Sequence, residues 1–150
     1  MQIAIASDHA ALALKALLVA HLREAGHEVS DLGPHDATSV DYPDYGYALA
    51  RAIADGSAER GVALCGSGIG ISIAVNREPA CRCARVSEPL SAALAREHND
   101  ANVIAMGARL IGDDMAKACI DAFMTTDYSG GRHAARVTKL SQPPAQEPAR

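Results

Sequence analysis

The chain has 150 residues, 49% of them hydrophobic, which predicts a folded domain with its own core and argues against a disordered chain. The formal net charge is −4, Trp is absent and aromatic residues make up 3%. Nucleic-acid-binding proteins usually carry a basic face and aromatic stacking platforms, so we expect no nucleic-acid partner. We also expect a cytoplasmic protein without a membrane partner, because the sequence shows neither a signal peptide nor the roughly 18 apolar residues that span a bilayer.

Short apolar runs alternate along the chain with longer amphipathic segments. Residues 2–6 predict a strand, and leucines near one face predict a helix over residues 10–25, which Gly26 ends. The pattern continues with strands over residues 28–32, 61–65, 82–86 and 102–106 and with helices over residues 45–54, 89–97, 113–124 and 132–140. This alternation predicts an α/β fold with a parallel sheet between two layers of helices.

We expect one domain over residues 1–141. The segment 142–150 contains Pro and polar residues without periodicity, which predicts a flexible C-terminal tail.

Polar clusters lie at or beside the ends of three predicted strands. Residues 7–9 follow the first strand, residues 65–70 follow the third and lead into a helix, and residues 98–100 precede the fifth. Ligands of open α/β sheets bind at the carboxyl ends of the strands, so the fold could gather these clusters. A helix cap for Asp8 and a helix end for His98 are the simpler alternatives.

The segment 65–70 reads Cys-Gly-Ser-Gly-Ile-Gly. Glycines at alternate positions allow backbone N–H groups to approach an anion at the start of a helix. A tight turn without a ligand explains the spacing as well, because it matches neither the dinucleotide-binding fingerprint nor the P-loop. A helix N-terminus beside Cys65 favours the thiolate, whereas a buried apolar role is the commoner one for cysteine.

Arginines near the C-terminus form a second candidate anion site. Arg132 and Arg136 are four residues apart after Gly130-Gly131, so on a helix they share a face that suits a phosphate. Two arginines alone more often form a solvated basic face. Arg109, just after the fifth strand, is a third candidate.

The four cysteines do not show the spacing of a disulfide framework, which favours cytosolic thiols. Cys81 and Cys83 are one residue apart and resemble half of a metal site. No matching His or Cys pair completes it, so we expect a structural role and no metal.

Taken in order, these segments resemble the ribose-5-phosphate isomerase B family, which also contains galactose-6-phosphate and allose-6-phosphate isomerases. The resemblance runs from about Ile3 to Leu140. It rests on a set of motifs, namely Ser7-Asp8-His9-Ala10, Asp41-Tyr42-Pro43, the segment 65–74, Ser87-Glu88-Pro89, the segment 98–103, Met106-Gly107-Ala108-Arg109 and Gly130-Gly131-Arg132-His133. It implies a three-layer, Rossmann-like α/β/α sandwich with a mainly parallel five-stranded sheet. It also implies a phosphorylated sugar substrate, no cofactor, and a homodimer or dimer of dimers with sites built from both subunits.

The resemblance further implies roles for individual residues in ribose 5-phosphate–ribulose 5-phosphate interconversion. Cys65 would be the base that moves a proton between C1 and C2 of the sugar. The enediolate would be held by Ser67 and the amides of Gly66, Gly68 and Gly70. Ring opening would fall to Asp8 and His98, and hydroxyl contacts to Tyr42 and Asn99. The phosphate would be bound by His9, Arg109, Arg132 and Arg136.

The sequence departs from the family pattern at two places. Some relatives use a glutamate base six residues after the position of Cys65, where this chain has Ile71, so it resembles the cysteine branch. Ala11-Leu12 replaces the usual Gly-Phe, which bears on packing more than on chemistry. A six-carbon sugar phosphate, a non-catalytic phosphosugar-binding domain and a flavodoxin-like module are the alternatives, in that order.

Overall fold

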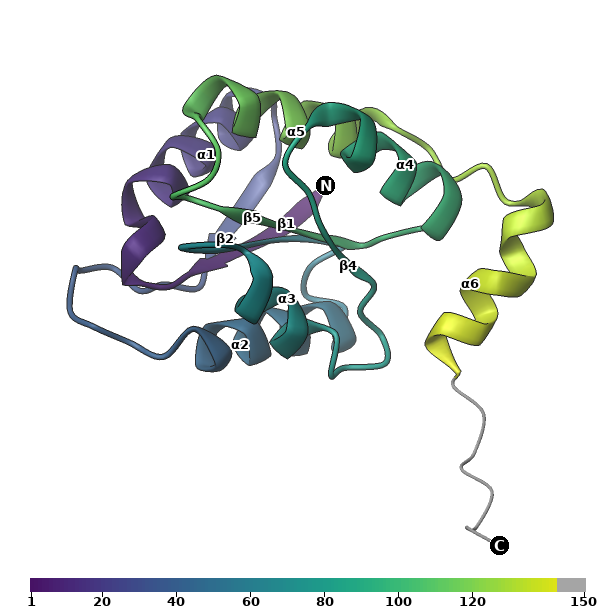
Figure 1. Cartoon of the computed structure of the whole chain (residues 1–150), viewed down its shortest axis with the longest axis horizontal. Helices are drawn as coiled ribbons and strands as arrows, with labels where there is room; N and C mark the ends of the chain where they lie inside the picture. The colour runs from purple at the N-terminus through teal and green to yellow at the C-terminus, as the bar shows by residue number, and fades with distance from the viewer. Residues whose placement is uncertain (143–150) are drawn as a thin grey trace, which may run out of the picture.

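Five parallel strands form one sheet in the order β2-β1-β3-β5-β4 in the computed structural model, which describes residues 1–142 (Figure 1). The strands are β1 (Gln2–Ser7), β2 (Glu28–Asp31), β3 (Arg60–Cys65), β4 (Cys83–Arg85) and β5 (Val103–Gly107). Every residue of β5 is buried, as expected for a parallel strand covered on both faces.

Helices cover both faces of the sheet. One face is covered by α1 (Leu12–Glu24), α4 (Pro89–Asn99) and α5 (Asp113–Thr125), and the other by α2 (Tyr42–Ala54) and α3 (Ile69–Val75). The expected three-layer α/β/α sandwich is therefore confirmed. Helix α6 (Ala134–Ser141) stands apart from these layers and buries none of its residues (Figure 1). None of the helices within residues 1–142 has both the length and the apolarity needed to cross a membrane.

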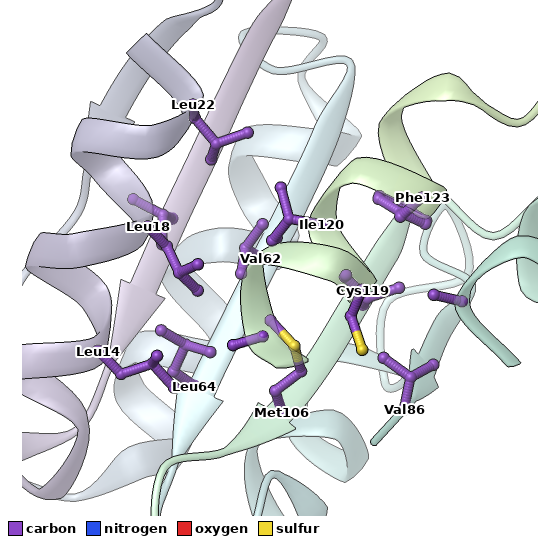
Figure 2. Packing of buried hydrophobic residues seen from close by; sticks show 14 of the residues in the cluster. Leu14, Leu18, Leu22, Val62, Leu64, Val86, Met106, Cys119, Ile120 and Phe123 are labelled. Carbon is purple, nitrogen blue, oxygen red and sulfur yellow. The ribbon is translucent and has the colours of Figure 1, made fainter. Parts of the chain in front are cut away.

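The alternation of side chains along β3 decides which way the site cysteine points. Val62 and Leu64 face α1 and α5, where Figure 2 shows them packed with Leu18 and Ile120. Cys65 is one residue further along the strand and therefore faces the opposite layer, formed by α2 and α3. This direction brings the sulfur beneath the loop that starts α3.

Several helices begin or end at residues other than the predicted ones. Helix α2 starts at Tyr42 instead of residue 45, because Asp41 is extended and Pro43 suits the first helical turn. A 3-10 turn, η1 (His9–Ala11), precedes α1, and another, η2 (Gly131–His133), precedes α6. Helix α4 continues to Asn99, two residues past its predicted end. The predicted tail lies outside the described residues from 143 onward.

A buried lysine fixes the loop that follows β2. The Nζ atom of Lys15, whose side chain is 3% exposed, donates to Asp31 Oδ1 and to the carbonyl oxygen of Pro34, both at 2.6 Å. Burial raises the pKa of Asp31, but hydrogen bonds from Lys15 and the Gly33 amide outweigh it and leave this pKa below its usual value. The pair therefore stabilises the fold above the pKa of unfolded Asp31, and that contribution is lost as the pH falls through the folded value.

We predict that Lys15→Met lowers the free energy of unfolding at pH 7 by about 3 kcal/mol, because it leaves a partly buried carboxylate without its partner. The deficit should be smaller at about pH 3, because this contribution is lost as the pH falls through the lowered pKa of Asp31. Urea unfolding at both pH values measures it, with Lys117→Met on α5 as the control. Equal stability of the two variants at pH 7 would contradict the role of the pair.

Candidate active site

Two of the predicted clusters meet at the carboxyl edge of the sheet. Ser7, the last residue of β1, pairs with Leu64, and Cys65 pairs with Gly107 at the end of β5. Asp8 is buried here; its amide donates to the carbonyl oxygen of Leu64 at 3.1 Å. Its Oδ1 also accepts the Ala10 amide at 2.9 Å, so Asp8 caps η1 and lies beside the cysteine at the same time.

The sulfur of Cys65 accepts a backbone hydrogen bond from the amide of Gly68 at 3.1 Å, and Cys65 is 4% exposed. An amide donor stabilises a thiolate. The other thiols lack such a donor among the contacts within residues 1–142. Burial raises the pKa of Cys81 to about 11 and that of Cys119 to about 11, and it raises the pKa of Cys83 as well. Cys65 is thus the thiol whose surroundings best fit a reactive role.

The glycine loop after Cys65 packs directly on the backbone at the end of β5. Gly68 has φ 75°, and a Cβ there would lie 2.7 Å from the carbonyl carbon of Met106. A Cβ on Gly107 would lie 2.5 Å from the carbonyl carbon of Ser67. Backbone contact this close allows no side chain between the two segments, so it fixes the Gly68 amide above the sulfur.

Two of the expected substrate contacts lie against this loop. The ring of Tyr42 would be 2.5 Å from a Cβ on Gly70, and the guanidinium of Arg109 would be 3.3 Å from a Cβ on Gly66. The Arg109 amide also donates to the carbonyl oxygen of Gly66 at 3.0 Å. Glycine at these positions thus leaves room for a phenol and a cation over the loop.

His9 lies at the same edge with its imidazole oriented by the chain. The Val40 amide donates to His9 Nδ1 at 3.1 Å, so a neutral His9 carries its proton on Nε2. An N–H in that position can donate to a phosphate oxygen.

A second cluster lies at the opposite edge of the sheet. The imidazoles of His98 and His133 stack with centroids 4.4 Å apart, and Asn99 follows at the end of α4. Arg136 Nη1 donates to the carbonyl oxygen of Arg132 at 3.5 Å, across the junction between η2 and α6. The sequence predicts that Arg132 and Arg136 lie on one face of one helix. In the structure, Arg132 belongs to the 3-10 turn η2 and Arg136 to α6.

The two clusters are separated within one chain. Helix α4 returns to the amino edge of the sheet before β5 begins, whereas Cys65 stands at the carboxyl edge. The length of β5 alone corresponds to about 13 Å. The fold of a single chain thus gathers Asp8, His9, Tyr42, Cys65 and Arg109, and leaves His98, Asn99, Arg132 and Arg136 elsewhere.

The second cluster is electropositive. Partial desolvation, together with the nearby His98, Arg132 and Arg136, lowers the pKa of His133. Sequence reasoning did not assign a role to His133, although its place in the Gly-Gly-Arg-His motif was a signal. Glu97 Oε1 lies 4.0 Å from His98 Nε2 and offsets part of this charge, but the basic side chains outnumber it and can attract an anion such as a phosphate.

A cavity of about 520 Å³ adjoins the second cluster and is lined in part by Asn99, Cys83 and Leu140. Within residues 1–142, no group of three or more His, Cys, Asp or Glu side chains is placed to hold a metal ion.

Comparison with known proteins identifies the family. The profile of the Ribose/Galactose Isomerase family matches residues 3–140, nearly the whole described chain. This chain belongs to that family. Ribose-5-phosphate isomerase B of Escherichia coli is 44% identical over 140 residues, which cover 93% of this chain and 94% of the relative. D-erythrulose-4-phosphate isomerase of Pectobacterium atrosepticum is 41% identical over 149 residues, covering 98% and 97%.

The structural comparison agrees with the family assignment. The solved structure of Clostridium thermocellum ribose-5-phosphate isomerase B superposes with a TM-score of 0.93 at 44% identity, covering 95% of this chain and 96% of that one. The matched residues, 3–140, include both clusters.

We predict that Gly68→Ala lowers turnover at least tenfold, because the new Cβ collides with the Met106 backbone and shifts the amide away from Cys65. Gly26→Ala is the matched control, since Gly26 has φ 86° but a Cβ there would meet nothing within 4 Å. Gly26→Ala should lower the free energy of unfolding by about 1 kcal/mol, because alanine disfavours a positive φ, and it should leave turnover unchanged. Similar turnover in both variants would show that the contact with β5 does not matter.

Proposed function

We propose that this protein interconverts ribose 5-phosphate and ribulose 5-phosphate through an enediolate. The observation that supports this most strongly is the Cys65 sulfur beneath the Gly68 amide, at the edge of the sheet where ligands of α/β folds bind. Relatives named ribose-5-phosphate isomerase B share 44% identity with the chain over almost its full length, which supports the same substrate.

In the proposed reaction, Cys65 removes the proton from C2 of the open-chain aldose and returns it to C1. The C–H bond is weakly acidic, so the negative charge that develops on the carbonyl oxygen must be stabilised. The Gly66 and Gly70 amides and the Ser67 hydroxyl supply donors for this oxygen, each worth on the order of 3 kcal/mol in comparable sites. The Gly68 amide is engaged by the Cys65 sulfur. Product formation also requires the proton of the C2 hydroxyl to pass to O1, so that C2 becomes the carbonyl carbon. The thiolate is regenerated when the carbon-bound proton is delivered to C1.

Ring opening precedes proton transfer, because the aldehyde carbon of ribose 5-phosphate is masked in the cyclic form. One group must donate a proton to the ring oxygen while another removes the proton of the C1 hydroxyl. Asp8 and His98 are the proposed pair, and Tyr42 and Asn99 contact the remaining hydroxyls. Guanidinium and imidazole groups hold the phosphate, namely those of His9, Arg109, Arg132 and Arg136. Binding the sugar at its phosphate end positions the reacting carbons at its other end.

A second copy of the chain completes each site in this proposal. The Cys65 cluster and the His98 cluster lie at opposite edges of one sheet, so one chain alone cannot place both around one sugar. Two chains related by a two-fold axis, with the carboxyl edge of each sheet facing the amino edge of the other, would form two such sites. This is the geometry of a homodimer. Exposed apolar side chains on α3 and α6, Ile69, Ile73 and Leu140, are suited to such an interface.

The proposed enzyme is a single domain over residues 1–141 that acts in the cytoplasm, where its free thiols would stay reduced. The substrate is bound without a metal or organic cofactor. A six-carbon sugar phosphate is the nearest alternative, and assays with four-, five- and six-carbon aldose phosphates separate the possibilities.

We predict that Cys65→Ala and Cys65→Ser abolish isomerisation, with a loss of about 1,000-fold or more, since the proton-transferring base is removed. Both should keep the wild-type thermal unfolding temperature and bind ribose 5-phosphate in calorimetry. Cys119→Ser, at a buried cysteine outside both clusters, is the control for loss of a thiol. Turnover near the wild-type rate in Cys65→Ala would remove Cys65 from the base role.

We predict that an inactive variant, Cys65→Ala, and a strongly impaired variant, His98→Asn, restore activity when they are co-expressed. Random pairing makes half of the dimers mixed, and each mixed dimer has one intact site of two, so about a quarter of the wild-type activity should return. Each variant expressed alone is the control. If no activity returns although mixed dimers are isolated by differential tagging, each site lies within one chain.

A further inference from the structure

Asp100 ends α4 in an unusual backbone conformation. Its φ of 46° and ψ of 41° are left-handed, and it is the one non-glycine residue within residues 1–142 with a positive φ. Glycine is the usual residue at the end of a helix in this conformation, because a Cβ is disfavoured there. A carboxylate at such a position needs an explanation beyond ending the helix.

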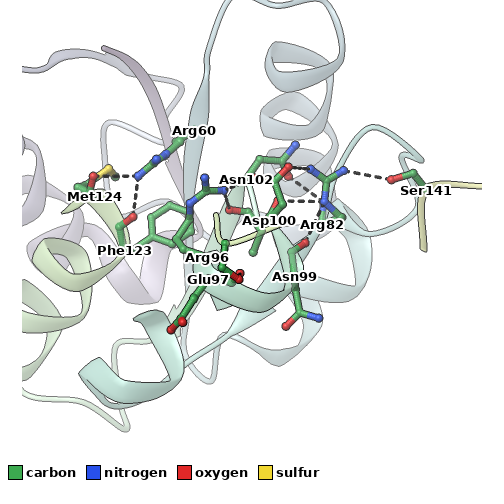
Figure 3. Close-up of polar contacts among 12 residues, drawn as sticks. Arg60, Arg82, Arg96, Glu97, Asn99, Asp100, Asn102, Phe123, Met124 and Ser141 are labelled. Atoms are coloured by element: carbon green, nitrogen blue, oxygen red, sulfur yellow. Dashed lines mark hydrogen bonds and ion pairs between the residues drawn. The ribbon is translucent and has the colours of Figure 1, made fainter. Parts of the chain in front are cut away.

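Two arginines hold both oxygens of this carboxylate (Figure 3). Arg96 Nη1 donates to Oδ1 and Arg82 Nη2 donates to Oδ2, each at 2.9 Å. Arg82 Nε also donates to the carbonyl oxygens of Asp100 at 2.9 Å and of Asn99 at 3.2 Å. Its planar fork therefore binds the last turn of α4 through side chain and backbone together.

One of these arginines, Arg96, is itself fixed by buried partners. Arg96 is a buried residue; its Nη1 atom also donates to the carbonyl oxygen of Ala101 at 2.6 Å. Its guanidinium lies 5.9 Å from the ring centroid of Phe123, and that of Arg60 lies 5.5 Å from the same centroid. Arg96 cannot swing away without breaking these contacts, so it is a rigid support for Asp100.

The clamp formed by Arg82, Asp100 and Arg96 also ties α4 to the segment that carries His133. Arg82 Nη1 donates to Ser141 Oγ at 3.1 Å, near the end of α6. At the other end of this segment, the Ser129 amide and hydroxyl donate to the carbonyl oxygen of Glu97, the residue before His98. His98 thus stands between two attachment points, with its ring stacked on His133.

We infer that Asp100 is a positioning residue, which acts through Arg82 and Arg96 to hold the His98 imidazole for ring opening. The inference rests on the proposed function, because it assigns Asp100 to the step given to His98. The carboxylate lies two residues from His98 and fixes the backbone turn from which that side chain projects. The alternative is that the clamp only stabilises the end of the helix.

The test is a double-mutant cycle with Asp100→Gly and His98→Asn, assayed with ribose 5-phosphate. Glycine keeps the left-handed backbone accessible and removes only the carboxylate. We expect Asp100→Gly to lower kcat/KM at least tenfold in the wild-type background and less than twofold in the His98→Asn background, because both changes affect one step. Asp100→Asn, which keeps one acceptor oxygen, should show a smaller loss. Asp114→Asn, an exposed acid on α5, is the control and should leave kcat/KM unchanged.

A second readout reports the position of His98 directly. Stacking on His133 shifts the imidazole proton signals of His98 in the NMR spectrum, and Asp100→Gly should move them to unstacked values while the rest of the spectrum stays folded. The inference is overturned if these signals do not move, or if Asp100→Gly costs the same factor in both backgrounds. A wild-type protein that does not isomerise ribose 5-phosphate, or a fully active His98→Asn, would instead refute the proposed function, and the NMR result would still decide the position of His98.

Discussion

The close backbone contact between the glycine loop and the end of β5 is the constraint on which the rest of the site depends. Gly68 and Gly107 each lie where a Cβ would collide with the opposing backbone, so the two segments meet without side chains between them. That contact holds the Gly68 amide 3.1 Å from the Cys65 sulfur. Tyr42 and Arg109 then lie over glycines of the same loop, so the loop arranges the neighbours of the thiol as well as the thiol.

Charge is distributed unevenly over a chain whose net charge is −4. The amino edge of the sheet carries His98, Arg132, His133 and Arg136, where desolvation and the neighbouring basic groups together lower the pKa of His133. Asp100, an acid at that edge, is paired with Arg82 and Arg96, and Glu97 Oε1 lies 4.0 Å from His98 Nε2. Within residues 1–142, Arg132 and Arg136 are the cations of this cluster that form no ion pair. A protein with a net negative charge can therefore still present a local positive site that suits a sugar phosphate. The Cys65 thiol lies at the opposite, carboxyl edge of the sheet.

Sequence reasoning predicted the strands, their parallel direction and the loop after Cys65, because each depends on local pattern: apolar runs, glycine spacing and a strand that leads into a helix. It placed Tyr42 in a loop, although the proline after it begins a helix there. It also missed the contributions of Asp100, Arg82 and His133. Those depend on contacts between residues far apart in the sequence, such as Arg82 with Asp100, 18 positions away, which no local pattern encodes. The separation of the two clusters follows from where α4 ends relative to β5, and this became visible only in three dimensions.

In the proposed enzyme, one sugar phosphate lies between the sulfur of one chain and the arginines of another. A crystal structure with ribose 5-phosphate bound tests this arrangement most directly. We expect the Cys65 sulfur within about 3.5 Å of C1 or C2 of the sugar, and the phosphate on Arg132 and Arg136 of a second copy. A sugar whose carbons lie beyond roughly 8 Å from that sulfur, outside any reach for proton transfer, would contradict it.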